Sequence, residues 1–142
     1  MDDDVLAENL RQTIGELVRT VRRAADTMSS GESAVLGYLD RTGPQTTADL
    51  AHKRAVSHQS AAKTVKELLT GGLVRTEPHT TDKRKLLVHI TETGRARLHA
   101  ERAQRSDRLN TAISETLNPA ERQQLRDGVN LLRRLTAHLQ ER

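Results

Sequence analysis

The sequence contains no cysteine, phenylalanine or tryptophan, and Tyr38 is its one aromatic residue. A chain without cysteine forms no disulfide and no thiolate metal site, and it has neither a cysteine nucleophile nor a thiol-based redox sensor. Without Phe and Trp the core has to be aliphatic, and Leu, Val, Ile and Ala at helical spacing can fill such a core. The composition therefore favours a mainly α-helical protein of the cytoplasm over an all-β sandwich.

Long apolar runs are missing as well, because hydrophobic residues make up only 35% of the chain and charged residues make up 30%. The sequence opens with MDDDVLAENL, which is acidic where a secretory signal would be basic. No apolar run approaches the length that crosses a bilayer. At 142 residues the chain is long enough for one integrated domain with its own core. We expect a cytoplasmic protein that has no membrane partner.

Positive charge is concentrated in the middle of the chain. The formal net charge of the whole chain is +4, and by segment it is −4 over residues 1–51, +5 over residues 52–85 and +3 over residues 86–142. A local excess of Lys and Arg is typical of a phosphate-binding surface, although a solvated charged face produces the same pattern. The middle segment is therefore the first candidate for contact with a polyanionic partner.

Helical spacing and cap residues organise the first half of the chain. Apolar residues recur every three or four positions over residues 5–28, which predicts a first helix about 35 Å long. Capping patterns predict three further helices. The first of these begins after Ser29 and ends at the loop 41–45. The second runs from Thr46 to about Ala55, and the third runs from Ser57 to Thr70.

After Gly71-Gly72, which suit a helix C-terminus, the apolar period changes from that of a helix to that of a strand. Residues 73–77 and 86–90 read as two strands, and residues 78–85 read as the loop of a hairpin. Two more helices are predicted, the first after Thr91 and the second from the boundary Asn118-Pro119-Ala120-Glu121. Two short helices followed by a β-hairpin form a winged helix-turn-helix, and the basic segment coincides with its second helix and hairpin.

The helix from Ser57 to Thr70 carries the best candidates for reading DNA. With Ala61, Val65 and Leu68 facing inward, the opposite face presents Gln59, Ser60, Lys63, Lys66 and Thr70. Gln pairs with adenine, Lys donates to guanine and Ser pairs with either base, whereas Lys66 near the helix end is better placed for phosphate. We expect His58 to project toward the apolar side. The solvated face of an ordinary amphipathic helix has the same pattern, so that alternative stays open.

The hairpin loop places three cations at the tip of a projecting element, namely Lys83, Arg84 and Lys85. Such a tip can enter a minor groove, whose negative potential favours Arg84. Asp82, two residues earlier, can hold the Arg84 guanidinium or brace the turn. An ordinary soluble loop is charged too, and the pattern by itself does not separate the two interpretations.

Five short motifs follow one another between Thr46 and Leu98. They are Leu50-Ala51 on the short helix, Val56-Ser57 at the turn, Leu68 with Gly72-Leu73-Val74, Asp82-x-Arg84 in the hairpin loop, and Ile90-Thr91-x-x-Gly94. In order and spacing this run resembles the winged-helix core of the MarR family of bacterial transcriptional regulators. The long flanking helices and Asn118-Pro119-Ala120-Glu121 fit as well, so the resemblance covers nearly the whole chain.

The resemblance implies a homodimer that binds double-stranded DNA at an inverted repeat and mostly represses transcription. Many members release DNA when a small molecule binds between the dimer helices and the winged lobe. On this chain, Ser57, Gln59, Ser60 and Lys63 would meet DNA through the helix, and Arg84 would meet it through the wing with support from Asp82. Lys66 and Lys83 complete the predicted DNA-binding set.

Two features depart from the family pattern. Arg54 stands where the family often has a small or apolar residue, which puts the packing of the short helix in question. The aromatic residues that often line the family's effector pocket are almost absent, so a phenolic effector is not supported. Tyr38 is the weak candidate for an effector contact, and core packing with a paired hydroxyl is the competing role.

We therefore predict a mainly α-helical fold with a small β-hairpin wing. Residues 1–28 and 91–142 form long dimerisation helices, and residues 29–90 form the winged helix-turn-helix lobe of one integrated domain. The apolar stripes of the long helices exceed what one subunit can cover, which independently favours a dimer. A two-fold dimer places two recognition helices about 34 Å apart, one turn of DNA, and this spacing predicts a palindromic site.

The same residues bear on other possible functions. No paired-histidine metal motif, nucleophile-base-acid group or phosphate-binding glycine loop is visible, so we expect neither an enzyme nor a cofactor. The six histidines are scattered and predict no metal site, although such residues can converge in a fold. The alternative function is a winged-helix module for protein interaction or metal response that has no direct small-molecule effector.

Overall fold

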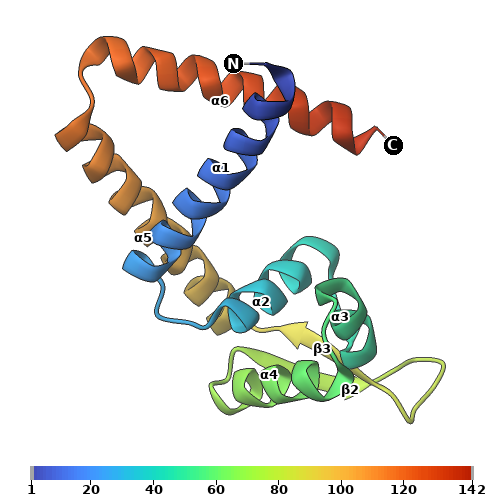
Figure 1. The fold of residues 1–142 in the computed structure, drawn as a ribbon. Helices are drawn as coiled ribbons and strands as arrows, with labels where there is room; N and C mark the ends of the chain where they lie inside the picture. The colour runs from blue at the N-terminus through green and yellow to red at the C-terminus, as the bar shows by residue number, and fades with distance from the viewer. Residues whose placement is uncertain (1, 142) are drawn as a thin grey trace. The chain divides into compact units, whose positions relative to one another are not determined.

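The structure is a computed structural model, and it describes residues 2–141. Within these residues the chain forms six helices and a three-stranded antiparallel sheet (Figure 1). The helices are α1 (Asp3–Ala25), α2 (Ser30–Thr42), α3 (Thr47–Arg54), α4 (His58–Thr70), α5 (Glu92–Thr116) and α6 (Pro119–Gln140). The strands are β1 (Gln45–Thr46), β2 (Val74–Pro78) and β3 (Leu86–Ile90). The predicted mainly α-helical winged fold is confirmed.

Tertiary contacts divide the chain into two compact units that separate after Arg105. The first unit contains α1, the helix-turn-helix elements, the sheet and the beginning of α5. The second unit contains the rest of α5 and α6. The assignment of residues 1–28 and 91–142 to dimerisation, and of residues 29–90 to a separate lobe, stays a prediction.

The core of the first unit is aliphatic, as the composition predicted. Its largest fully buried side chains come from α2, α3, α4, β3 and α5, and they are Val35, Leu36, Leu39, Leu50, Leu68, Val88 and Leu98. Burying each of these side chains contributes about 1.5–3 kcal/mol of transfer free energy. Helices α2, α3 and α4, the start of α5 and the sheet are therefore held together as one body, which fixes the positions of α4 and the β2–β3 loop.

The sheet has one strand more than the predicted hairpin. β3 pairs with β2 on one side, from Val74 opposite Ile90 to Pro78 opposite Leu86, and with β1 on the other side. β1 has only two residues, Gln45 and Thr46, too few for an alternating pattern to show in the sequence. Its pairing with Val88 and Leu87 ties the segment before α3 to the base of the wing.

The turn between α3 and α4 is set by caps at both ends. Thr46 and Asp49 form the predicted capping box of α3, and the Ser57 hydroxyl accepts a hydrogen bond from the Ser60 N–H at the start of α4. Ala55 adopts a left-handed backbone with φ of 54°, which turns the chain from one helix to the next. His58 is exposed at the first position of α4, so its expected orientation toward the apolar side was wrong.

Arg54 fits at the end of α3 because Gly31 on α2 has no side chain. A Cβ at Gly31 would lie 2.8 Å from Nη2 of Arg54 and 3.5 Å from the Thr64 hydroxyl oxygen. The guanidinium thus occupies space between α2 and α4 that a small residue would leave unfilled. Nη1 of Arg54 is buried there and has no hydrogen-bond partner among the described residues.

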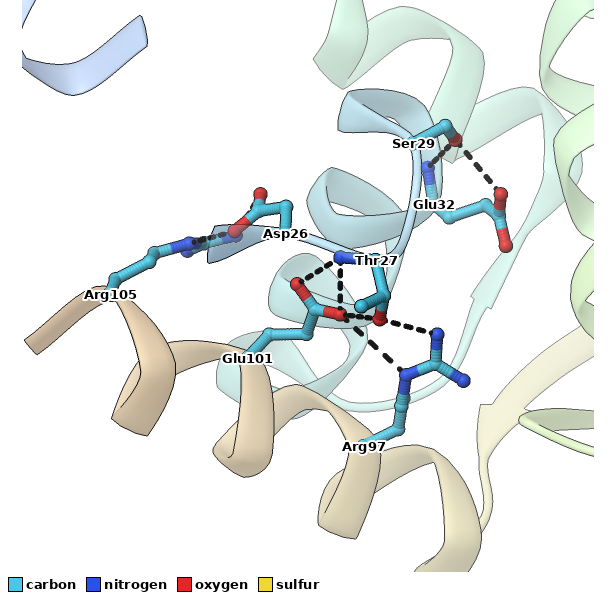
Figure 2. A network of polar contacts seen from close by, with 7 residues as sticks. All are labelled: Asp26, Thr27, Ser29, Glu32, Arg97, Glu101 and Arg105. Carbon is cyan, nitrogen blue, oxygen red and sulfur yellow. Dashed lines mark hydrogen bonds and ion pairs between the residues drawn. The ribbon is translucent and has the colours of Figure 1, made fainter. Parts of the chain in front are cut away.

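The first helix ends earlier than predicted, at Ala25 instead of Met28, because the next residues bind to α5 (Figure 2). Asp26 accepts two hydrogen bonds from Arg105, at 2.7 and 2.8 Å. The Glu101 carboxylate is 3% exposed and accepts the Thr27 N–H at 2.9 and 3.1 Å and also the Thr27 hydroxyl. The extended backbone at Asp26 lets Met28 enter the core, where it is buried.

The Asp26–Arg105 pair predicts a loss of stability in acid. The Arg105 guanidinium holds the pKa of Asp26 below its usual range, against the smaller opposing effect of burial. A carboxyl with a lowered pKa in the folded state stabilises the fold at neutral pH, and this contribution is lost as pH falls from about 5 toward 2. We expect Asp26→Asn to lower the free energy of unfolding by about 2 kcal/mol at neutral pH.

The measurement is urea unfolding of both chains at neutral pH and at about pH 3. The difference between wild type and Asp26→Asn should shrink in acid, because Asp26 is then largely protonated in the unfolded chain and part of the stabilisation by the ionised carboxyl is lost. Glu8→Gln is the control, since Glu8 pairs with Arg11 on the exposed face of α1 and should change little. If the stability difference between wild type and Asp26→Asn has the same size at both pH values, the ionised Asp26 carboxyl is not its cause.

Candidate nucleic-acid interface

The exposed face of α4 brings together the predicted helix residues. Ser57, Gln59, Ser60, Lys63 and Lys66 are all exposed, and together with Ala62 they line one shallow depression on the surface. In the part of the chain that the structure describes, the side chains of Gln59, Lys63 and Lys66 make no hydrogen bond or ion pair. Their donors and acceptors are therefore free to meet another molecule.

The apolar side of α4 fixes this orientation. Ala61, Val65 and Leu68 are buried, and Leu68 contributes to the core. Ser57 has a second role, because its hydroxyl oxygen caps the helix at 3.0 Å from the Ser60 N–H. The Ser57 hydroxyl proton is still available to donate to a phosphate. The first turn of α4 contains no acidic residue, which leaves the positive end of the helix uncompensated.

The β2–β3 loop projects from the sheet and carries the predicted wing cations (Figure 1). Arg84 is held by Asp82, whose Oδ1 accepts from the Arg84 N–H and from its Nε, each at 3.1 Å. These hydrogen bonds also hold the pKa of Asp82 below its usual range. The Arg84 side chain is nevertheless 91% exposed, and Lys83 beside it is exposed too. Asp82 thus both braces the turn and orients the guanidinium, the two roles considered for it.

The sequence interpretation missed His79, which lies at the start of the same loop. Its ring nitrogen Nδ1 is 3.2 Å from the backbone nitrogens of both Thr81 and Asp82. A polar side chain two or three residues ahead of a turn is a signal for such a cap, but histidine is an uncommon residue in that role. The loop geometry therefore depends on a residue outside the predicted set.

A cationic cavity of about 340 Å³ in the first unit contains Tyr38, the predicted candidate for an effector contact. Its other lining residues are Arg22, Ser33, Ala34, Gly37, Arg41, Leu98, Arg102 and Arg105. The Tyr38 hydroxyl donates to the Lys53 carbonyl at 3.4 Å, and the Arg41 guanidinium lies 5.2 Å from the ring centroid. Tyr38 thus has a paired hydroxyl and also forms part of the cavity wall.

The arginines of this cavity outnumber their carboxylate partners. Arg105 pairs with Asp26, and Arg102 lies 3.5 Å from Asp40, which also receives Arg95 at 3.3 Å. Arg41 faces the Tyr38 ring. The Ser33 hydroxyl is buried and has no hydrogen-bond partner among the described residues. The cavity therefore combines excess positive charge with an unsatisfied hydroxyl, and the arginines were not singled out because they are scattered in sequence.

Residues 2–141 contain neither a membrane-spanning helix nor a metal-binding cluster. None of the helices in that range is apolar enough over a sufficient length to span a membrane. No group of three or more His, Asp or Glu side chains in that range is arranged to hold a metal ion.

Comparison with known proteins gives the family. The model of the MarR family matches residues 26–85. An HTH-type transcriptional regulator of Mycobacterium bovis is 30% identical over 135 residues, which cover 93% of this chain and 94% of the relative. A transcriptional regulator of Pseudomonas aeruginosa with a solved structure is 30% identical, with a TM-score of 0.79 over 95% of each chain.

More distant structures share the fold. A transcriptional regulator of Thermotoga maritima has a TM-score of 0.80 at 16% identity over 99% of each chain. A mutant of S. aureus MepR, solved bound to an oligodeoxyribonucleotide, has a TM-score of 0.67 at 17% identity over 93% of this chain and 96% of MepR.

The helix-turn-helix with its exposed cationic face and the braced arginine of the wing define a winged helix-turn-helix protein that binds DNA. The chain belongs to the MarR family of HTH-type transcriptional regulators. The resemblance read from the sequence is thereby confirmed. The family and these relatives are regulators and not enzymes, in agreement with the prediction.

Proposed function

We propose that this chain is a cytoplasmic, homodimeric repressor that binds an inverted repeat in double-stranded DNA and is released by a small anionic molecule. The observation that carries the DNA-binding part is the free cationic face of α4 beside the Asp82-braced Arg84 of the wing. The DNA-bound MepR structure, which has the same fold, supports this mode of action.

In this proposal α4 lies in the major groove. Gln59 and Lys63 face base edges near the beginning of the helix, where bidentate contacts distinguish base pairs by about 1–3 kcal/mol each. Ser57, Ser60 and Lys66 contact phosphate and fix the register of the helix. Arg84 and Lys83 reach the minor groove beside it, where the negative potential of A·T-rich sequence favours arginine.

The proposed dimer is supported by apolar side chains that are exposed on the long helices α1 and α6. On α1 these include Leu6, Ile14 and Leu17, which are 54%, 37% and 48% exposed. On α6 they include Leu135, which lines an apolar groove with Leu131. Exposed stripes of this kind normally find a partner surface, and a second copy of the chain presents the same stripes. A two-fold dimer explains an inverted-repeat site.

Single substitutions on α4 and the wing should separate base reading from phosphate contact. We expect Lys63→Ala and Gln59→Ala to weaken binding to a duplex selected from random sequences by about 5- to 100-fold. Binding to a scrambled duplex should weaken much less. Arg84→Ala should weaken both more evenly, with the greatest loss on A·T-rich flanks.

Gel-shift titrations of each variant on the selected and scrambled duplexes measure these effects. Arg133→Ala removes one exposed cation from α6 and serves as the matched control for lost charge. Equal losses on both duplexes for Lys63→Ala would count against base reading. The interaction-module alternative makes a different prediction, namely no duplex binding even at low salt, whereas phosphate contacts give binding that falls steeply as salt rises.

The cavity around Tyr38 supports an anionic effector. Arg22 and Arg41 are the lining arginines not engaged by a close carboxylate, and Leu98 and Ala34 add apolar wall. A carboxylate with a short aliphatic chain fits this chemistry. Hexanoate should release the duplex, the neutral analogue hexanamide should not, and Arg41→Gln should abolish the response without weakening DNA binding. Equal release by both compounds would exclude recognition of charge.

A further inference from the structure

The β2–β3 loop is organised around the imidazole of His79. Its Nδ1 lies 3.2 Å from the Thr81 nitrogen, 3.2 Å from the Asp82 nitrogen and 3.1 Å from the Thr81 hydroxyl oxygen. A backbone N–H can only donate, so Nδ1 must be the acceptor and carries no proton. The ring is therefore neutral in this arrangement, with its proton on Nε2.

A short series of hydrogen bonds connects this acceptor to the wing arginine. The His79 N–H donates to the Lys85 carbonyl at 2.9 Å, and the Lys85 N–H donates to the Asp82 carbonyl at 3.0 Å, which closes the loop. The Asp82 backbone is held by His79, and the Asp82 carboxylate holds Arg84 through its N–H and Nε. The direction of the Arg84 guanidinium thus depends on the acceptor at His79.

We propose that His79 is a positioning residue for DNA binding, whose unprotonated Nδ1 closes the wing loop and through Asp82 presents Arg84 to DNA. The inference rests on the proposed contact of Arg84 with DNA. Protonation of the ring removes the acceptor, because imidazolium has only donors. Binding to the specific site is therefore sensitive to the protonation of this side chain.

The surrounding charges do not replace the lost acceptor. The loop carries the charged groups Asp82, Lys83, Arg84 and Lys85, and the nearby strand carboxylate, Glu77, is engaged by Arg75 and His89. Asp82 is committed to Arg84. Among the described residues the Thr81 and Asp82 amides have no other side-chain acceptor. Protonation of His79 leaves both amides to solvent.

Two substitutions separate the position of the acceptor from the size of the side chain. Asn Oδ1 and His Nδ1 are both bonded to Cγ, so His79→Asn keeps an acceptor in the same place and does not titrate. Gln carries its oxygen one bond farther out, so His79→Gln keeps an amide but misplaces the acceptor. Because the loop is exposed, neither change should prevent folding.

The first measurement uses NMR on the free full-length protein. In wild type the amide signals of Thr81 and Asp82 should shift with pH along the titration of the His79 ring. In H79N these signals should be independent of pH over the same range. In H79Q both amides should exchange with solvent several-fold faster than in wild type while the His79 ring is neutral, and this difference should disappear once the wild-type ring is protonated.

The second measurement is the ratio of affinities for the selected duplex with A·T-rich flanks and with G·C-rich flanks, because Arg84 of the wing acts on the flanks and the general effect of charge cancels. At about pH 7.5, H79N should match wild type and H79Q should show a ratio about 3- to 10-fold lower. As pH is lowered from about 7.5 until the His79 ring signals show protonation, the wild-type ratio should fall about 3- to 10-fold relative to H79N. The other histidines are common to both chains and cancel as well.

The outcomes distinguish the inference from the proposed function. Amide signals that ignore the His79 titration, or H79N behaving like H79Q in the duplex ratio, would overturn the role of His79 alone. The role of His79 would also be overturned if duplex binding requires Arg84 while H79Q binds the duplexes as wild type does. No duplex binding by any chain, with the amide signals still following His79, would refute the proposed DNA contact of the wing, and the inference would fall with it.

Discussion

Replacing Gly94 with alanine is expected to lower the free energy of unfolding by about 3 kcal/mol or more. A Cβ at this position would lie 2.1 Å from the Leu73 carbonyl oxygen and 2.9 Å from Cγ1 of Ile90. The carbonyl cannot move away freely, because it accepts the Thr91 N–H at 3.1 Å. The Thr91 hydroxyl also donates to the Gly72 carbonyl and accepts the Gly94 N–H, so the start of α5 is tied to the entry of β2.

Urea unfolding followed by circular dichroism measures this loss. A total stability of about 5–15 kcal/mol means that Gly94→Ala should remove a large part of it. Gly128→Ala is the matched control, because nothing lies within 4 Å of a Cβ at this helical position in α6. There alanine should raise stability by up to about 1 kcal/mol. Equal urea midpoints for Gly94→Ala and Gly128→Ala would show that α5 can shift away from β2.

Replacing Leu135 with glutamate is expected to convert the protein to a monomer and to weaken binding to an inverted-repeat duplex by about 100-fold or more. Leu135 is 51% exposed on α6, with Leu131 and Leu139 on the same face at 55% and 66%. A carboxylate placed in the centre of an apolar interface is taken out of water, which disfavours its charged form. A monomer reaches one half-site and loses the gain from linking two recognition helices.

Analytical ultracentrifugation gives the assembly state, and gel shifts on duplexes with one or two half-sites give the affinities. Ala137→Glu places the same charge on the opposite side of α6 and should leave both properties near wild type. Binding to a single half-site should be little changed by Leu135→Glu, because α4 and the wing are untouched. If the Leu135→Glu chain remains dimeric, the dimer interface does not include this face of α6.

Local patterns predicted most of the fold. The caps at Ser29, Thr46, Ser57 and Asn118 form as expected, because a cap depends on residues within three positions of one another. The aliphatic periodicity likewise placed Leu36, Leu50 and Leu68 in the core, since helical spacing decides which face is apolar. The exposed face of α4 follows from the same spacing, so the predicted helix residues lie together on the surface.

Contacts between distant residues account for what those patterns missed. β1 exists only because β3 lies beside it, α1 ends at Ala25 because α5 binds the next two residues, and the Arg54 guanidinium lies against Gly31 of α2. The arginines around Tyr38 come from three helices and form a cavity only after folding. Each of these features depends on atoms more than about ten residues apart, which no local periodicity records.

The amino-acid order alone therefore decided that this chain makes amphipathic helices, a cationic recognition helix and a charged hairpin, because each is set by neighbours along the chain. Folding decided that Gly94 must be glycine, that the linker after α1 is held on α5, and that a ring nitrogen of His79 closes the wing. Steric exclusion and hydrogen-bond direction act between atoms in space, and only the tertiary structure brings those atoms within range.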